Sequence, residues 1–144
     1  MIGDRDMLPD NLRDAVEQAE TATAHYDNFY LNMALAYGGR NEMLRTTAKI
    51  LDDVREQKIS KDDITPELFE ENLYGNNVTI PPVDLIIRTG NECRTSNFLP
   101  WLANGHESAV YFCAPYWPMF RKIDMLRAIR VYSERQEMKK KLSC

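Results

Sequence analysis

Short apolar runs alternate with segments of helical periodicity along this chain, and this alternation restricts its fold more than any other feature. The runs that indicate strands cover residues 29–36, 83–87 and 109–113. The β-branched residues of the second run favour a buried strand in particular. Helical segments separate the runs, so the strands need crossover connections rather than hairpins. We therefore expect an α/β fold with a parallel sheet covered by helices on both faces.

The helical segments are marked by apolar spacing and by residues that start helices. Asp10 precedes the first segment, and we expect it to cap that helix. Thr65 and Pro66 indicate a later helix, with the threonine as cap and the proline at the first helical position. The expected helices cover residues 12–22, 44–54, 66–74, a segment between the second and third apolar runs, and 124–139.

Size and charge limit what the chain can be. A chain of 144 residues with 44% apolar content can bury one core, so residues 1–144 are expected to form a single unit. The formal net charge of -4 argues against a nucleic-acid partner, which needs a broad cationic surface. Any anion site must therefore be local.

The cysteines and the absence of long apolar runs suggest a cytoplasmic protein. The three cysteines, Cys93, Cys113 and Cys144, are far apart and form no C-x-x-C pair. This arrangement is more typical of reduced thiols than of a disulfide framework or a zinc site. No run of the sequence approaches the roughly 18 apolar residues that a membrane span needs, and the start lacks a basic segment followed by an apolar one.

Two loops that follow expected strands have a composition suited to anions. The first, at residues 37–42, contains Gly38, Gly39 and Arg40 before a helix. Glycines permit close backbone approach, and the start of a helix presents free amides. A tight turn with Arg40 in solvent is the alternative interpretation.

The second loop, at residues 88–98, contains Arg88, Arg94 and Ser96 directly after a strand. Guanidinium groups bind phosphate oxygens bidentately, and loops at the carboxyl ends of parallel strands are common ligand sites. The alternative is that Ser96 only caps a helix and that both arginines are surface charges.

Three ordered segments resemble motifs of the cis-prenyltransferase family. Residues 31–42 resemble its N-x-A-x-x-Y-G-G-R-x-E motif, and residues 84–98 resemble its D-L-x-I-R-T-G-x-E-x-R-x-S-N-F signature. Residues 117–120 match its W-P-x-F segment. The segment from Pro100 to Glu107 is similar to that of archaeal members of the undecaprenyl diphosphate synthase type. The resemblance runs from about Ile2 to Arg135.

The resemblance implies a prenyltransferase that condenses isopentenyl diphosphate with an allylic prenyl diphosphate and uses Mg²⁺. Each addition would create a cis double bond. By motif position, Arg88, Arg94 and Ser96 would hold isopentenyl diphosphate, while Gly38, Gly39 and Arg40 would shape the neighbouring wall. Glu107 is the candidate Mg²⁺ ligand, since Mg²⁺ prefers carboxylate and phosphate oxygens; a solvated loop carboxylate is the alternative.

One part of the family pattern has no counterpart here. The family's amino-terminal strand, with a D-G-N-x-R-W-like segment that supplies the catalytic aspartate, is not found in these residues. We therefore expect the carboxyl-terminal portion of the fold, an incomplete version without its own catalytic aspartate. A homodimer or a complementing subunit is expected, as is peripheral membrane association through the lipid product. A non-catalytic accessory subunit of a cis-prenyltransferase complex and an unrelated phosphate-binding module are the alternatives.

Overall fold

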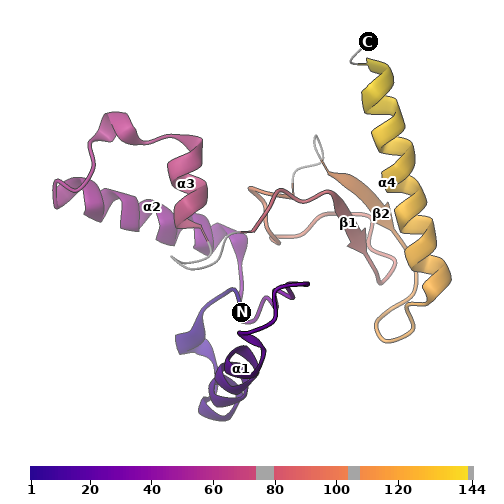
Figure 1. Ribbon diagram of the computed structural model, residues 1–144, viewed down its shortest axis with the longest axis horizontal. Coiled ribbons are helices and arrows are strands. Elements are labelled where there is room, and N and C mark those ends of the chain that lie inside the picture. Colours follow the sequence, from indigo (N-terminus) through magenta and orange to yellow (C-terminus); the bar gives the residue numbers. More distant parts are fainter. Residues whose placement is uncertain (74–79, 104–107, 143–144) are drawn as a thin grey trace. The chain divides into compact units, whose positions relative to one another are not determined.

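The computed structural model describes residues 1–73, 80–103 and 108–142. The chain divides into two compact units, Met1–Ile80 and Pro81–Cys144. Each unit is described by itself (Figure 1). Helices make up most of the first unit, while the second combines strands with a long helix. That residues 1–144 form a single domain therefore stays a prediction.

The first unit contains the α-helices α1 (Asp10–Thr23), α2 (Gly39–Arg55) and α3 (Pro66–Asn72), with the short 3₁₀ helices η1 (Arg5–Met7) and η2 (Lys61–Asp63). The side chain of Thr65 accepts a hydrogen bond from the backbone N–H of Leu68, and Pro66 stands at the start of α3. Both features match the predicted start of this helix, because a cap and a proline act through local geometry.

Helices α2 and α3 pack against each other and hold the core of the first unit. Ile50 and Leu73 are buried with 3% and 1% of their surface exposed. The side-chain amide of Asn72 connects the two helices, because its Oδ1 accepts a hydrogen bond from Lys49 Nζ at 2.6 Å while its Nδ2 donates to the Leu68 carbonyl. A polar contact thus fixes the register of an apolar interface.

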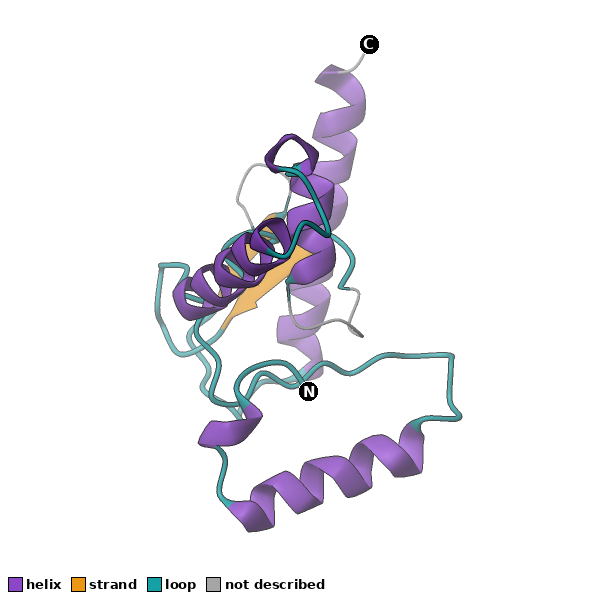
Figure 2. Cartoon of the chain, turned by 90° about the vertical axis from the view of Figure 1, so that its left-hand side faces the viewer, coloured by secondary structure: helices purple, strands orange, loops and turns teal. Residues whose placement is uncertain are grey.

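Two expectations for the first unit are wrong. Pro9, not Asp10, is the N-cap of α1, and Asp10 is the first helical residue. Residues 29–36 do not form a strand: their pairing within the described residues is an isolated parallel bridge between Ala34 and Ile2, and Figure 2 shows the segment as loop. Phe29 and Leu31 are 92% and 84% exposed, so the apolar run lacks the covering neighbours that would make it a buried strand.

The second unit is built on a parallel pair of strands, β1 (Leu85–Arg88) and β2 (Ala109–Phe112). Their register pairs Leu85 with Ala109 and Arg88 with Phe112. Helix α4 (Lys122–Leu142) packs against both strands and buries Ala128 completely. The α/β class and the parallel sheet are as predicted, and Arg88 stands at the carboxyl end of its strand.

The helix expected after Ser96 is not found among the described residues that precede β2. Residues 99–103 form a turn instead, in which the backbone N–H groups of Leu102 and Ala103 donate to the Leu99 carbonyl. Leu99 has φ +46, a left-handed conformation that an α-helix does not contain. The chain therefore does not enter an α-helix at this point.

The first turn of α4 is fixed by a buried carboxylate. Asp124 is 2% exposed and accepts hydrogen bonds from the backbone N–H and the Nε of Arg121, both at 3.1 Å.

Among the described helices, none is both long enough and apolar enough to cross a bilayer.

Candidate functional site

The loop after β1 is anchored to the segment that follows β2. The backbone N–H of Gly90 donates to the Pro115 carbonyl at 2.9 Å, and that of Asn91 donates to the Cys113 carbonyl at 3.1 Å. Both residues have positive φ, +84 for Gly90 and +56 for Asn91, so the chain turns sharply here. The turn places the residues after Cys93 back beside β1.

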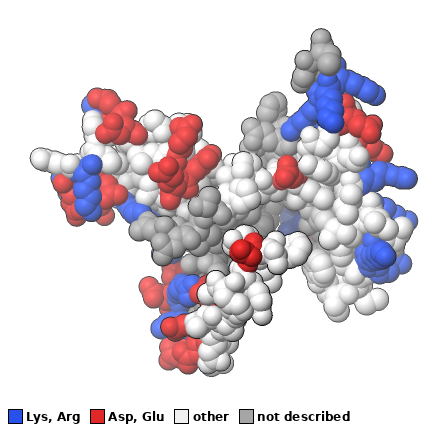
Figure 3. Space-filling view, viewed as in Figure 1, with Lys and Arg blue, Asp and Glu red and all other residues white. Residues whose placement is uncertain are grey.

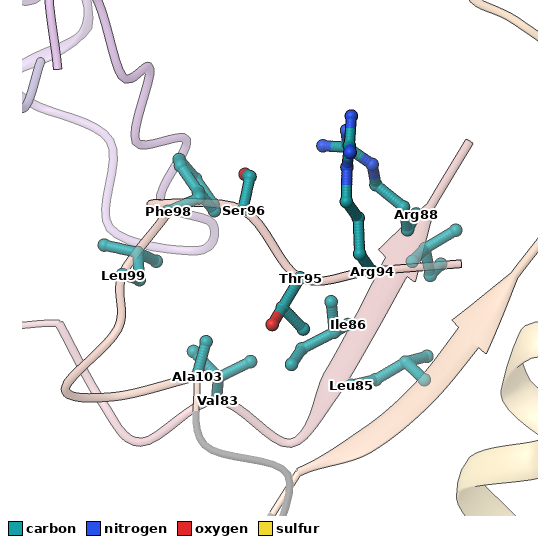
Figure 4. Close-up of a pocket in the computed structure, with 11 residues that line it drawn as sticks. Val83, Leu85, Ile86, Arg88, Arg94, Thr95, Ser96, Phe98, Leu99 and Ala103 are labelled. Carbon is teal, nitrogen blue, oxygen red and sulfur yellow. The ribbon is translucent and has the colours of Figure 1, made fainter. Parts of the chain in front are cut away.

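Arg88, Arg94 and Ser96 line one pocket of about 300 Å³. Figure 4 shows the two guanidinium groups extending in the same direction from β1 and from the loop, with the Ser96 hydroxyl on the same side. The remaining lining is mostly apolar: Val83, Leu85, Ile86, Ile87, Thr95, Phe98, Leu99 and Ala103. The pocket therefore joins a cationic rim to an apolar floor.

Arg88 carries the clearest sign that this pocket is built for an anion. Its Nε is buried and has no hydrogen-bond partner within the part of the chain that the structure describes. Buried donors normally have partners, so an unpartnered one in a pocket needs an explanation. A bound anion would supply the missing acceptor, because guanidinium N–H groups bind phosphate oxygens in pairs.

Arg94 is more exposed than Arg88 and is paired with Glu92. Its Nε lies 2.9 Å from Oε2 of Glu92, and its side chain is 73% exposed. Ser96 is exposed as well. These groups can reach a ligand from solvent without moving the sheet.

Residues that the sequence did not single out complete the pocket. Thr95 lines it together with Phe98 and Leu99, and Figure 4 shows the Thr95 hydroxyl on the opposite side from the guanidinium groups. The alternation of Arg94, Thr95 and Ser96 could have indicated this, because successive side chains of an extended segment point in opposite directions.

The other predicted site residues belong to the first unit. Gly38 is the N-cap of α2 and lines a cavity of about 230 Å³ together with Asn41 and Arg45. Gly39 is buried at the start of that helix and Arg40 is exposed. That they form a wall beside the arginines of the second unit stays a prediction.

Glu107, the candidate Mg²⁺ ligand, lies outside the described residues. Within residues 1–73, 80–103 and 108–142, no cluster of three or more histidine, cysteine, aspartate or glutamate side chains could hold a metal ion. The geometry therefore assigns the metal to no particular side chain.

Residues 1–140 match the family model described as "Putative undecaprenyl diphosphate synthase". The chain belongs to the cis-prenyltransferase family. It is 50% identical over 142 residues to the tritrans,polycis-undecaprenyl-diphosphate synthase (geranylgeranyl-diphosphate specific) of Methanosarcina mazei, covering 98% of this chain and 48% of that protein. The enzyme of the same name from Haloarcula marismortui is 51% identical over 136 residues, covering 94% and 44%.

Solved structures of other cis-prenyltransferases have the same fold. Lavandulyl diphosphate synthase from Lavandula x intermedia, solved with dimethylallyl diphosphate, aligns with a TM-score of 0.84 and 34% identity, covering 91% of this chain and 55% of that one. A probable undecaprenyl diphosphate synthase from Campylobacter jejuni aligns with a TM-score of 0.73 and 31% identity, covering 92% and 57%. The chain thus spans about half the length of the cis-prenyltransferases it matches.

Proposed function

We propose that this chain binds isopentenyl diphosphate through Arg88, Arg94 and Ser96, as part of an enzyme that adds it to an allylic prenyl diphosphate. The observation that carries the proposal is the pair of guanidinium groups lining one pocket, with the Nε of Arg88 buried and without a hydrogen-bond partner among the described residues. The names of the related synthases support the same reaction class.

The pocket suits an anion that carries a short apolar group. Each charge-assisted hydrogen bond from an arginine contributes about 1.5–3 kcal/mol, so two guanidinium groups can hold a diphosphate firmly. The apolar lining, which includes Leu85, Ile86 and Leu99, can receive the hydrocarbon part of the same molecule. The head and the tail of isopentenyl diphosphate thus have distinct neighbours.

Positioning is the main contribution that these residues would make to the reaction. The allylic diphosphate leaves as the new carbon–carbon bond forms, so the reaction already has a good leaving group. What it needs is an acceptor held in the right place and compensation of negative charge. Arg88 and Arg94 would supply both for isopentenyl diphosphate.

Mg²⁺ is proposed as the cofactor, bound largely through diphosphate oxygens and water, with Glu107 as the candidate protein ligand. This ion usually takes only one or two carboxylates and keeps several waters. When bound, it would neutralise phosphate charge. The complete reaction is proposed for an enzyme in which this chain takes part, as a homodimer or with a complementing subunit, in the cytoplasm.

The affinity for isopentenyl diphosphate, measured by calorimetry, tests the proposal. Arg88→Ala and Arg94→Ala should each weaken binding by at least about tenfold, since each removes charge-assisted hydrogen bonds. Arg130→Ala is the matched control, because Arg130 is an exposed arginine of α4 outside the pocket lining, in the helix where Figure 3 shows lysine and arginine side chains gathered.

The same measurement separates this proposal from the alternatives. Unchanged affinity in both pocket variants would exclude the proposed site and favour an unrelated anion-binding module. Absence of isopentenyl diphosphate binding, combined with binding to a complete cis-prenyltransferase, would instead identify a non-catalytic accessory subunit.

A further inference from the structure

We propose that Glu92 is a positioning residue that orients Arg94 for the diphosphate. This inference rests on the proposed function, because it assigns a role to a side chain that contacts Arg94 rather than the ligand. Glu92 does not line the pocket, yet its Oε2 lies 2.9 Å from Nε of Arg94.

Glu92 contacts the Nε edge of the Arg94 guanidinium group, which is not the edge that a phosphate would contact through the two terminal nitrogens. A guanidinium group presents its donors in a fixed fork, and the Nε edge is distinct from the edge formed by the two terminal nitrogens. Because the carboxylate of Glu92 lies against Nε, a phosphate would approach Arg94 along the edge formed by the terminal nitrogens, where a bidentate contact is possible. The carboxylate therefore fixes the direction of the side chain without blocking its ligand-binding edge.

The exposure of the pair shows why Glu92 matters more for binding than for folding. The Arg94 and Glu92 side chains are 73% and 43% exposed, and ion pairs this exposed add little to folding stability. Arginine, however, has high rotamer entropy, and fixing it before the ligand arrives lowers the cost of binding. The gain would appear in ligand affinity.

The loop supplies a rigid base for this contact. Asn91, the residue before Glu92, is fixed to the Cys113 carbonyl by its backbone N–H, and Gly90 is fixed to Pro115. These hydrogen bonds therefore hold the backbone directly before Glu92 in place. A carboxylate near an anion site can also repel the ligand. A positioning role predicts weaker ligand binding when Glu92 is removed, whereas repulsion predicts tighter binding.

Binding of inorganic pyrophosphate and of isopentenyl diphosphate to Glu92 variants tests this role. Glu92→Ala should weaken both affinities about three- to fivefold, the size expected for an exposed ion pair. Glu92→Gln should retain most of the affinity, because its amide oxygen can still accept from Nε. In the Arg94→Ala background, Glu92→Ala should cause no further loss, which a general structural effect would not reproduce.

Three outcomes would overturn the inference: unchanged affinity in Glu92→Ala, tighter binding in that variant, or an equal loss with and without Arg94. If Arg94→Ala weakens binding while Glu92→Ala does not, only the positioning role fails. If Arg94→Ala itself has no effect, the proposed function fails instead. Urea unfolding of each variant checks that the fold is retained.

Discussion

Gly90 lies directly against the aromatic ring of Tyr116. A Cβ atom at Gly90 would be 3.1 Å from Cε1 of that ring, which is closer than side chains normally approach. Gly90 also has φ +84, a conformation that L-residues rarely adopt. The turn that brings Arg94 back to the pocket therefore depends on a residue without a side chain.

Gly90→Ala should lower the free energy of unfolding by about 1–2 kcal/mol, the usual cost of a left-handed residue with a Cβ atom. It should also weaken isopentenyl diphosphate binding, because the loop carrying Arg94 would shift. Urea unfolding and calorimetry measure the two effects. Adding Tyr116→Ala should relieve the ring contact but not the backbone cost, so stability should recover only in part. Full stability in Gly90→Ala would contradict this account of the turn.

Asp124 should make the stability of the protein depend on pH in the acid range. Hydrogen bonds from the Arg121 side chain are the largest cause that lowers the pKa of Asp124 below its ordinary value of 3.8. The carboxylate therefore stabilises the fold above that pH, and this contribution is lost as the pH falls through the lower folded-state pKa.

Asp124→Asn should lower the thermal unfolding midpoint at pH 7, and its difference from the wild type should shrink at pH values below 3.8. Arg121→Ala should reproduce both effects, since it removes the main partner. Thermal unfolding followed by circular dichroism over a pH series measures this. A difference that stays constant down to acid pH would show that the carboxylate charge is not involved.

The thiols of the second unit should differ in reactivity. Cys93 is exposed, whereas Cys113 is 8% exposed, and burial followed by the charge of Asp124 raises the pKa of its thiol. In a Cys144→Ser background, a thiol reagent at pH 8 should modify Cys93 first and Cys113 only slowly. Unfolding in urea should remove the difference. Equal rates in the folded protein would contradict the burial of Cys113.

The parts of the fold that follow from local chemistry could be predicted from the sequence. Thr65 and Pro66 determine where α3 starts because a cap and a fixed φ act within one turn. The run at residues 29–36 is apolar enough for a strand, but a strand also needs a continuous ladder of partners, and the described residues provide an isolated bridge between Ala34 and Ile2 instead. Leucine does not indicate a positive φ, so the sequence predicts a helix after Ser96, whereas the structure has a turn at Leu99.

In the candidate site, too, some features could be predicted from the sequence and others depend on the packing of side chains. Arg88, Arg94 and Ser96 could be grouped from the sequence because they stand in one loop at the carboxyl end of a parallel strand, the edge of the sheet where ligands usually bind. The contact of Glu92 with the Nε edge of Arg94 could not, because it depends on the direction of two long side chains. The same holds for the Nε of Arg88, because its burial without a partner in the described part of the chain follows from the packing around it.

The most direct test follows the guanidinium groups themselves. In NMR spectra of ¹⁵N-labelled protein, the Nε–H signals of Arg88 and Arg94 should both shift when isopentenyl diphosphate is added, while that of Arg121, which is bonded to Asp124, should not. Assignment would use the Arg88→Lys and Arg94→Lys spectra. Saturable binding that leaves both signals unmoved would contradict the claim that these two arginines hold the diphosphate.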